Sequence, residues 1–229
     1  MSLRVSRGIL GIALVLVSLT ANAAQGQITL AENTFNPALR NGGDNLFSYG
    51  HTIGAEDFSL ASTYSITSIS HLSFHTPSQV QPTSIDWFLY DNNGTTPGAV
   101  LFSGNSTTYT TAVEQFVGQY DITRYSIALS GITLGPGDYW VGFHNNTEAG
   151  YVDPHWAFAS GGTSIDNRNA ISTNDGLTWS NHYSGGDDDM AFRVEGAVVA
   201  TPEPASLALL ATGLVGIAAA LRRKRARVA

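Results

Sequence analysis

Two tryptophans in one long stretch with weak strand signals are the first candidates for chemistry in this sequence. Trp156 follows an Asp-Pro-His triplet, and Trp179 comes three residues after an Asn-Asp-Gly turn sequence. An exposed aromatic ring can stack on a sugar face while nearby Asn and Asp side chains hydrogen-bond the hydroxyl groups. We therefore interpret Trp156 and Trp179 as candidate glycan contacts. The alternative is that both rings cap a hydrophobic core.

The densest acidic cluster is Asp187, Asp188 and Asp189, directly after two glycines. Calcium takes roughly 6–8 oxygen ligands at about 2.3–2.6 Å, and carboxylates on a turn can supply several of them. Asp44, Glu56 or Asp57 could complete such a site if the first and last strands pair. The cluster lacks the spacing of an EF-hand loop, so a solvated acidic turn is the alternative. Calcium is the only cofactor that the sequence suggests, and the other expectation is no cofactor.

Motifs that carry enzyme chemistry are missing from the sequence. It has no His-Glu-x-x-His, no Gly-x-Ser-x-Gly and no phosphate-binding glycine loop with lysine. It has no cysteine, which excludes disulfides, thiol catalysis and cysteine-ligated metals. His71 and His75 lie roughly 13 Å apart on an expected strand, too far to share a metal, and we interpret them as exposed. We therefore expect a non-enzymatic protein without catalytic residues; the alternative is an envelope hydrolase whose triad assembles in space.

The C-terminal 28 residues have three consecutive parts. Pro202, Glu203 and Pro204 form a stiff, extended strip with few backbone donors, which suits recognition by a protein groove. The uncharged run 205–221 would be about 25 Å long as a helix, close to the thickness of a hydrocarbon core, and is predicted to cross a membrane. A basic cluster then stops translocation and keeps the C-terminus in the cytoplasm. This cluster consists of Arg222, Arg223, Lys224, Arg225 and Arg227.

The three parts together resemble the PEP-CTERM sorting signal of surface proteins in Gram-negative bacteria. The resemblance covers residues 201–229, with Pro202, Glu203 and Pro204 as the recognition strip and the basic cluster as the stop signal. It implies processing by an integral-membrane exosortase during export, often in species that make exopolysaccharide. The expected partners are the exosortase, the general secretion machinery, the membrane before processing, and exopolysaccharide. An ordinary C-terminal membrane anchor is the alternative interpretation of the run and the basic cluster.

The N-terminus predicts a secretory signal peptide over residues 1–23. Arg4 and Arg7 supply a positive region, and residues 9–19 form an apolar stretch too short to span a membrane. Ala21 and Ala23 form an A-x-A cleavage site, so cleavage after Ala23 is expected. The chain is therefore expected to pass through an inner-membrane intermediate and to reach the cell surface or the extracellular space.

Between these signals, residues 24–200 are enough for one domain of ordinary size. This segment holds seventeen acidic residues against four arginines, which leaves a net charge of about −13, compared with −7 for the whole chain. Such an acidic domain would be repelled by nucleic acid and by anionic lipid. We therefore expect no nucleic-acid partner.

The pattern of residues 24–200 predicts strands and no amphipathic helix. Gly, Pro and Asn turns separate many short runs of β-forming residues, which is typical of an antiparallel β-sandwich. The sequence predicts an all-β, jelly-roll-like sandwich, flanked by a signal-peptide helix and a C-terminal transmembrane helix. Residues 25–50 are expected to be irregular. The expected strands are 57–60, 64–74 with a bulge, 85–90, 99–102, 107–117 paired with 120–129, 138–144 and 190–194.

Four stretches of this domain resemble a recurring ectodomain of surface proteins that carry the same tail. They are residues 55–58, 85–101, 137–140 and 189–194. The resemblance implies a jelly-roll-like sandwich without a settled activity. We thus expect an exported surface or matrix protein with a structural or adhesive role linked to exopolysaccharide and biofilm. The alternative is a calcium-dependent carbohydrate-binding module.

Overall fold

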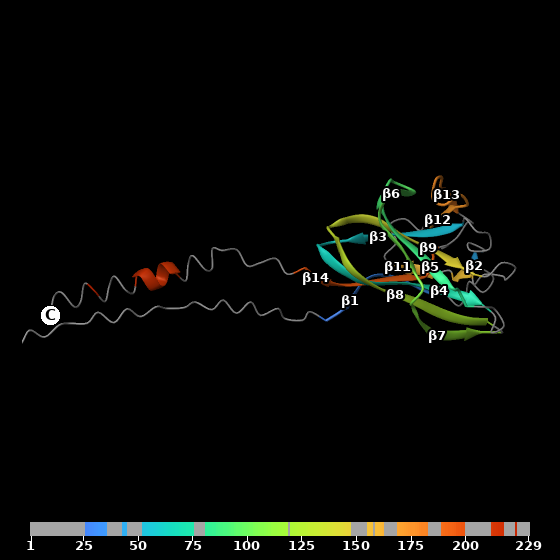
Figure 1. Ribbon diagram of the computed structural model, residues 1–229, viewed down its shortest axis with the longest axis horizontal. Coiled ribbons are helices and arrows are strands. Elements are labelled where there is room, and N and C mark those ends of the chain that lie inside the picture. Colours follow the sequence, from blue (N-terminus) through green and yellow to red (C-terminus); the bar gives the residue numbers. More distant parts are fainter. Residues whose placement is uncertain are drawn as a thin grey trace, which may run out of the picture.

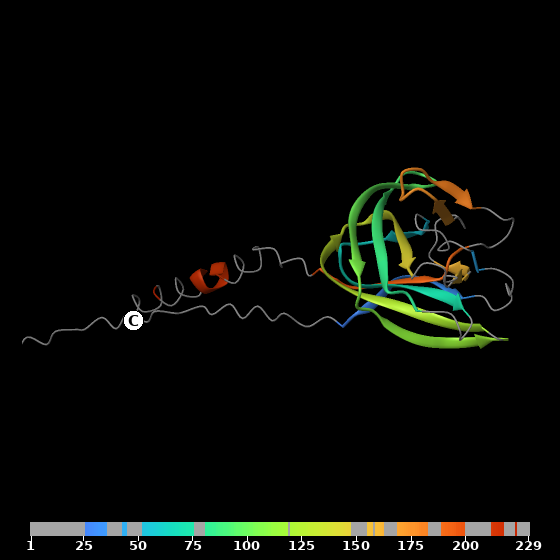
Figure 2. The same ribbon diagram turned by 45° about the vertical axis from the view of Figure 1, so that its right-hand side comes forward.

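A computed structural model of the chain describes residues 26–35, 43–44, 52–75, 81–118, 120–147, 155–157, 159–162, 169–182, 189–199, 212–217 and 223. Within residues 26–199 the described part consists of strands and their connections, and every strand pairing is antiparallel (Figure 1). The strands form two sheets that face each other, as Figure 2 shows. The predicted all-β sandwich is therefore confirmed.

The first sheet is organised around β4 (Tyr64–His75), which pairs with β8, with β14 and, near its end, with β10. Its outer strands are β7 beyond β8, β1 and β11 beyond β14, and β2 beyond β10. The other members are β1 (Ile28–Phe35), β2 (Gly43–Asp44), β7 (Thr110–Val117), β8 (Tyr120–Leu134), β10 (His155–Ala157), β11 (Ala159–Gly162) and β14 (Phe192–Val198).

The second sheet has the strand order β13-β12-β3-β9-β5-β6. Its edges in the described residues are therefore β13 on one side and β6 on the other. The strands are β3 (Ile53–Leu60), β5 (Ser84–Asn92), β6 (Pro97–Ser106), β9 (Gly137–Asn146), β12 (Asn169–Ser172) and β13 (Ser180–His182).

The hydrophobic core lies between the two sheets because apolar side chains alternate along the strands. Tyr125 and Ile127 of β8 face Val141 and Phe143 of β9, and all four are almost completely buried. Successive strand residues point to opposite faces, so this period of two fills one layer from both sheets. The largest fully buried side chains of the described residues include Trp140, Trp156, Phe58 and Phe192.

Two local predictions about strand geometry are confirmed. The register of β4 against β8 shifts between Ile66 and Ser68, which is the expected bulge. The β7–β8 pair turns at Gly118, whose φ of 65° lies in the left-handed region that favours glycine.

Arginine and glutamate side chains form a ladder across the first sheet. Arg124 of β8 donates to Glu114 of β7 and, from Nη1, to Ser70 Oγ of β4 at 3.0 Å. Its Nη2 lies 3.6 Å from Glu32 Oε1 of β1, and Arg193 of β14 donates to the same oxygen from Nε at 2.9 Å. The described arginines of the sandwich are thus both paired with carboxylates.

The structure differs from the sequence prediction in two segments. Residues 25–50, expected to be irregular, contain β1 and β2, and the weak-signal stretch after residue 150 contains β10–β13. β1 has polar residues among its eight positions, but it pairs with β14 and β11 and buries Ala31 and Asn33. Pairing with strands far away in sequence stabilises these segments, and a local pattern does not report it.

β1 begins and β14 ends at the same end of the sandwich, on the left in Figure 1, where Ile28 lies opposite Gly196. Beyond this point, residues 212–217 are helical. Among the described residues, no helix is long and apolar enough to cross a membrane. The predicted signal peptide with Ala21 and Ala23, and most of the run 205–221, lie outside the described residues.

Candidate functional site

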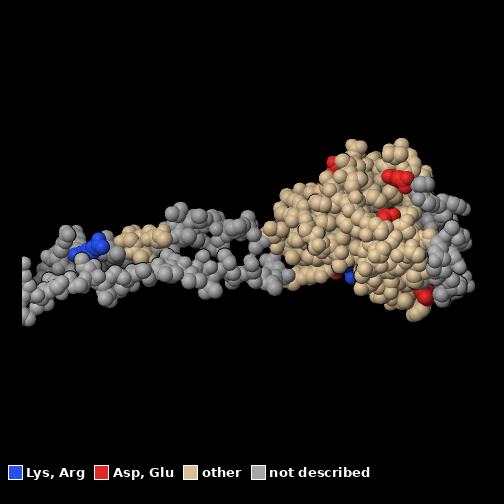
Figure 3. Space-filling view, viewed as in Figure 1, with Lys and Arg blue, Asp and Glu red and all other residues tan. Residues whose placement is uncertain are grey.

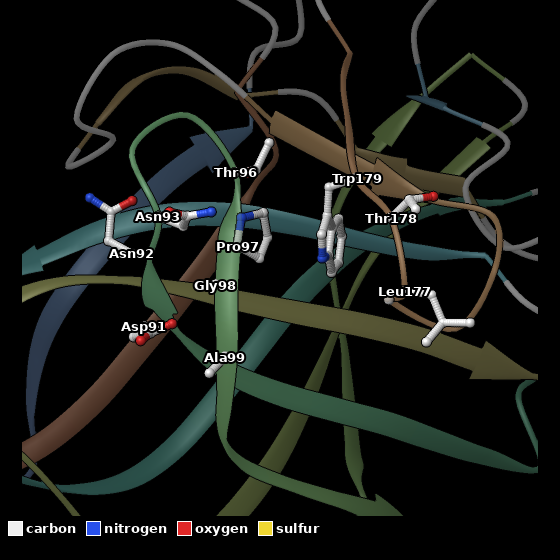
Figure 4. Close-up of a pocket in the computed structure, with 11 residues that line it drawn as sticks. Asp91, Asn92, Asn93, Thr96, Pro97, Gly98, Ala99, Leu177, Thr178 and Trp179 are labelled. Atoms are coloured by element: carbon white, nitrogen blue, oxygen red, sulfur yellow. The ribbon is translucent and has the colours of Figure 1, made fainter.

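A pocket of about 490 Å³ lies between the β5–β6 turn and the β12–β13 loop (Figure 4). Residues 91–93 and 96–99 form one wall, and residues 176–179 form the other. These two segments meet at the top of the sandwich in Figures 1 and 2. Pockets that bind small organic ligands are typically about 300–1,000 Å³, so this one has the size of a ligand site.

The β5–β6 wall is built from a bulge and a tight turn. Tyr90 pairs with Val100 and Asn92 pairs with Pro97, with a register shift between them at Asp91. A bulge turns a side chain away from its regular direction and is common beside functional sites. The turn closes through Asn93 N, which donates to Thr96 O at 3.1 Å. Asn92, Asn93 and Gly94 are typical turn residues, but a local pattern does not show which other segment they meet.

Asn92 is held in this wall by a buried tryptophan. Trp140 Nε1 donates to Asn92 Oδ1 at 3.0 Å, and the Trp140 ring is 0 % exposed. Burial of an indole N–H requires a partner, and the Asn92 oxygen provides it. The position of the Asn92 amide is therefore set by the packed core beneath the pocket.

The β12–β13 wall is held by a hydrogen-bond network around Asn174. Asn174 Oδ1 accepts from Thr178 N at 3.0 Å and from Ser172 Oγ at 2.9 Å, and its Nδ2 donates to Thr178 Oγ1 at 2.9 Å. Ser172 Oγ also accepts from Gly176 N at 2.8 Å. Asp175 adopts a left-handed φ of 59°, which Asp tolerates better than most residues. The loop is thus ordered by its own side chains before any ligand arrives.

Trp179 stands on this loop as an aromatic wall. Its ring is half-buried and contacts Tyr90 in a T-shaped arrangement, with centroids 5.3 Å apart and planes at 83°. Tyr90 in turn stacks with Phe88 and belongs to a cluster with Ala55 and Trp140 on the outer face of the second sheet. Figure 4 shows the Trp179 ring beside Pro97, with Leu177 farther along the loop. The contact with Tyr90 therefore holds the Trp179 ring in place on one side, and the ring lines the pocket on the other.

Trp156, the other candidate glycan contact, lies in the core between the sheets. Its side chain is 0 % exposed, and its Nε1 donates to Ala191 O at 2.7 Å. The centroid of its ring lies 5.4 Å from that of Phe143 and 6.0 Å from that of His71. A ring that is enclosed in this way presents no face to a sugar. Trp156 is therefore a core residue, which was the alternative to a glycan contact. The structure does not place Trp156 near Trp179.

The acidic cluster is described only at Asp189, because Asp187 and Asp188 lie outside the described residues. Asp189 is 0 % exposed, and the neighbouring Met190 N donates to Glu56 Oε2 at 2.8 Å. Glu56 is also buried and accepts from Asn33 Nδ2 of the opposite sheet at 3.3 Å. Within the described part of the chain, no group of three or more His, Asp or Glu residues has an arrangement that could hold a metal ion.

His71 is buried, which corrects its interpretation as an exposed strand histidine. The imidazole ring stacks on Tyr125 with ring centroids 5.4 Å apart, and it contacts Phe143 with centroids 4.6 Å apart. Burial, and to a smaller extent the positive charge of Arg124, lower the pKa of His71 to about 3, although a hydrogen bond with Asn145 opposes the shift. His71 is therefore a neutral core residue at physiological pH. The side chain of His75 lies outside the described residues.

Two antiparallel sheets that pack face to face place the described domain among the β-sandwich proteins. Residues 200–224 match the family model of the PEP-CTERM protein-sorting motif. The match includes Pro202, Glu203 and Pro204 and the first part of the basic cluster. This motif marks the chain as an exported protein that is sorted to the cell surface by an exosortase. A comparison with curated proteins found no match.

Proposed function

We propose that this protein is a non-enzymatic adhesive component of the cell surface or extracellular matrix, and that it binds exopolysaccharide through the Trp179 pocket. The observation that carries the proposal is the pocket itself, in which a half-buried tryptophan faces a wall of amide, hydroxyl and carboxylate groups. The sorting motif adds that the domain is delivered to the surface, where such polymers are found.

The pocket has the two kinds of group that sugar recognition requires. The Trp179 ring offers an apolar face to the C–H groups of a pyranose, and Asn92, Asn93 and Thr178 offer donors and acceptors for hydroxyl groups. The Asn174 network holds the loop in place, so little conformational entropy would be lost on binding. These features favour a binding module over a catalytic site.

The sorting signal follows β14, and the pocket lies in a different region of the sandwich. β14 ends at Val198, close before Pro202, at the end of the sandwich where β1 begins. In our proposal the run 205–221 holds the chain in the inner membrane until the exosortase acts near Pro202–Pro204. The pocket lies on loops between other strands, so it would remain accessible before and after processing.

The first experiment tests polymer binding. Exported protein purified from the producing cells should be retained on the producer's own exopolysaccharide, and Trp179→Ala should reduce retention at least about tenfold, as expected for an aromatic anchor. Phe116→Ala is the matched control, because Phe116 is 73 % exposed on β7 of the other sheet. Equal retention of Trp179→Ala and wild type would exclude the pocket as the binding site.

The same experiment tests the calcium alternative. Retention is measured with added calcium and with EDTA. Retention that disappears in EDTA, together with heat on isothermal titration with calcium, would support a calcium-dependent module involving Asp187, Asp188 and Asp189. Unchanged retention would leave a metal-independent module.

A second experiment tests the sorting step. The intact mass of the mature surface protein is expected to show loss of the chain from about residue 202 onward, and of residues 1–23 at the other end. In a strain without its exosortase, the uncleaved form should accumulate in the inner membrane. A full-length C-terminus on the surface protein of normal cells would contradict the processing that we propose.

A further inference from the structure

Asp91 carries the only charged side chain among the described residues that line the pocket. The other polar lining groups are neutral amides and hydroxyls, and no lysine or arginine is among them. A negatively charged ligand in the pocket would therefore meet a carboxylate without a cation beside it. At separations of several ångströms near a protein surface, two like charges repel by an amount that matters for binding.

The described arginines of the sandwich do not compensate for this charge. Arg124 and Arg193, the described arginines of the sandwich, belong to the first sheet and are paired with Glu32 and Glu114. In the face shown in Figure 3, carboxylates appear at several points of the sandwich, and basic surface appears only at its lower edge. Since residues 24–200 carry about −13 in total, the long-range field at the pocket is also negative.

Asp91 is seated in its position by the backbone around it. Asp91 lies opposite a bulge in β6, where Gly98 and Ala99 stand between Pro97 and Val100, and its Oδ1 lies against Gly98. A Cβ at position 98 would overlap with that oxygen, so a larger residue there would require the carboxylate to shift. Oδ1 accepts no hydrogen bond from any described residue. In Figure 4 the side chain extends from β5 towards Gly98.

We propose that Asp91 is a specificity-determining residue, and that it makes the pocket accept neutral and amino sugars while it excludes uronates. The proposal rests on glycan binding at Trp179 and names the class of sugar that this site takes. A protonated amino group would be attracted by the carboxylate and by the field of the domain, whereas a sugar carboxylate would be repelled. Trp179 supplies the affinity, and Asp91 decides between charge classes.

The test uses one polymer in two charge states. The exported protein is titrated with the neutral exopolysaccharide fraction that it retains, and with the same fraction after oxidation of its C6 hydroxymethyl groups to carboxylates. Wild type should bind the oxidised form weaker by on the order of tenfold at low salt. This difference should shrink at 1 M salt, where the Debye length is about 3 Å.

Three variants make the result specific. Asp91→Asn keeps the shape beside Gly98 and removes the charge, so it should bind both forms with similar affinity. Asp121→Asn makes the same charge change in β8 of the other sheet and should discriminate like wild type. Trp179→Ala should lose both forms.

The outcomes separate the two proposals. If Asp91→Asn discriminates as strongly as wild type, or if wild type binds both forms equally, the role of Asp91 is overturned while glycan binding stands. If Trp179→Ala binds both forms like wild type, or if wild type retains no polymer, the proposed function fails and the specificity of Asp91 fails with it.

Discussion

Replacing Trp156 with alanine is expected to lower the free energy of unfolding by about 3–5 kcal/mol, the range for truncating a large buried aromatic side chain. The ring is 0 % exposed, contacts Phe143 and His71, and donates its N–H to Ala191 O. Truncation would leave a cavity between the sheets and remove one of the two hydrogen bonds that Ala191 O accepts, the other coming from Leu72 N. Urea denaturation followed by fluorescence and circular dichroism would measure the change.

The comparison with Trp179→Ala separates a core role from a binding role. Trp179 is half-buried at the surface, so its truncation should cost far less stability while it removes glycan retention. Trp156→Phe serves as a milder variant, since it keeps an aromatic ring and loses the N–H together with the volume of the second ring. If Trp156→Ala had wild-type stability but lost retention, Trp156 would belong to the binding site after all.

Acidification is expected to destabilise the protein through His71. An unfolded histidine has a pKa of about 6.5, whereas burial holds the pKa of folded His71 at about 3. The unfolded state therefore binds a proton over this range and the folded state does not. The contribution of His71 is fully present above pH 6.5 and is lost progressively as the pH falls towards 3. Between pH 7 and pH 4 this amounts to roughly 3 kcal/mol of unfolding free energy.

His71→Phe isolates this effect, because the variant keeps the other titratable groups. Phenylalanine suits the pocket formed by Tyr125, Phe143 and Trp156, so the variant should fold. The difference in unfolding free energy between wild type and His71→Phe should change by about that amount between pH 7 and pH 4. Parallel stability curves would contradict a depressed pKa, and NMR titration of the His71 ring provides a second measurement in the unmodified protein.

Several structural features followed directly from local sequence. The alternation in Tyr125 and Ile127, the bulge after Ile66 and the turn at Gly118 all depend on neighbouring residues, and the structure has each of them. The β1 strand did not follow, because its partners β14 and β11 lie more than a hundred residues further along the chain. A strand that is stabilised mainly by distant partners has a weak local pattern.

The sequence allowed only part of the candidate site to be predicted. The turns at Asn93–Gly94 and Asn174–Gly176 and the aromatic Trp179 were recognisable, but nothing local connects Asp91 with Trp179. Trp156 and Trp179 also look alike in sequence, since both sit in a stretch rich in polar residues. Trp156 is enclosed because its strand places the ring between the two sheets, whereas the loop of Trp179 places that ring at the surface.

The sequence by itself determined the sorting of this protein, because its motif at residues 200–224 is a continuous segment whose identity does not depend on folding. It also determined the all-β class, since alternation and turn residues act over a few positions. Only the tertiary structure decided that Trp156 is core, that His71 is buried and that Asp91 shares a pocket with Trp179. The physical reason is that burial and proximity arise when two sheets pack, and packing joins residues that are far apart along the chain.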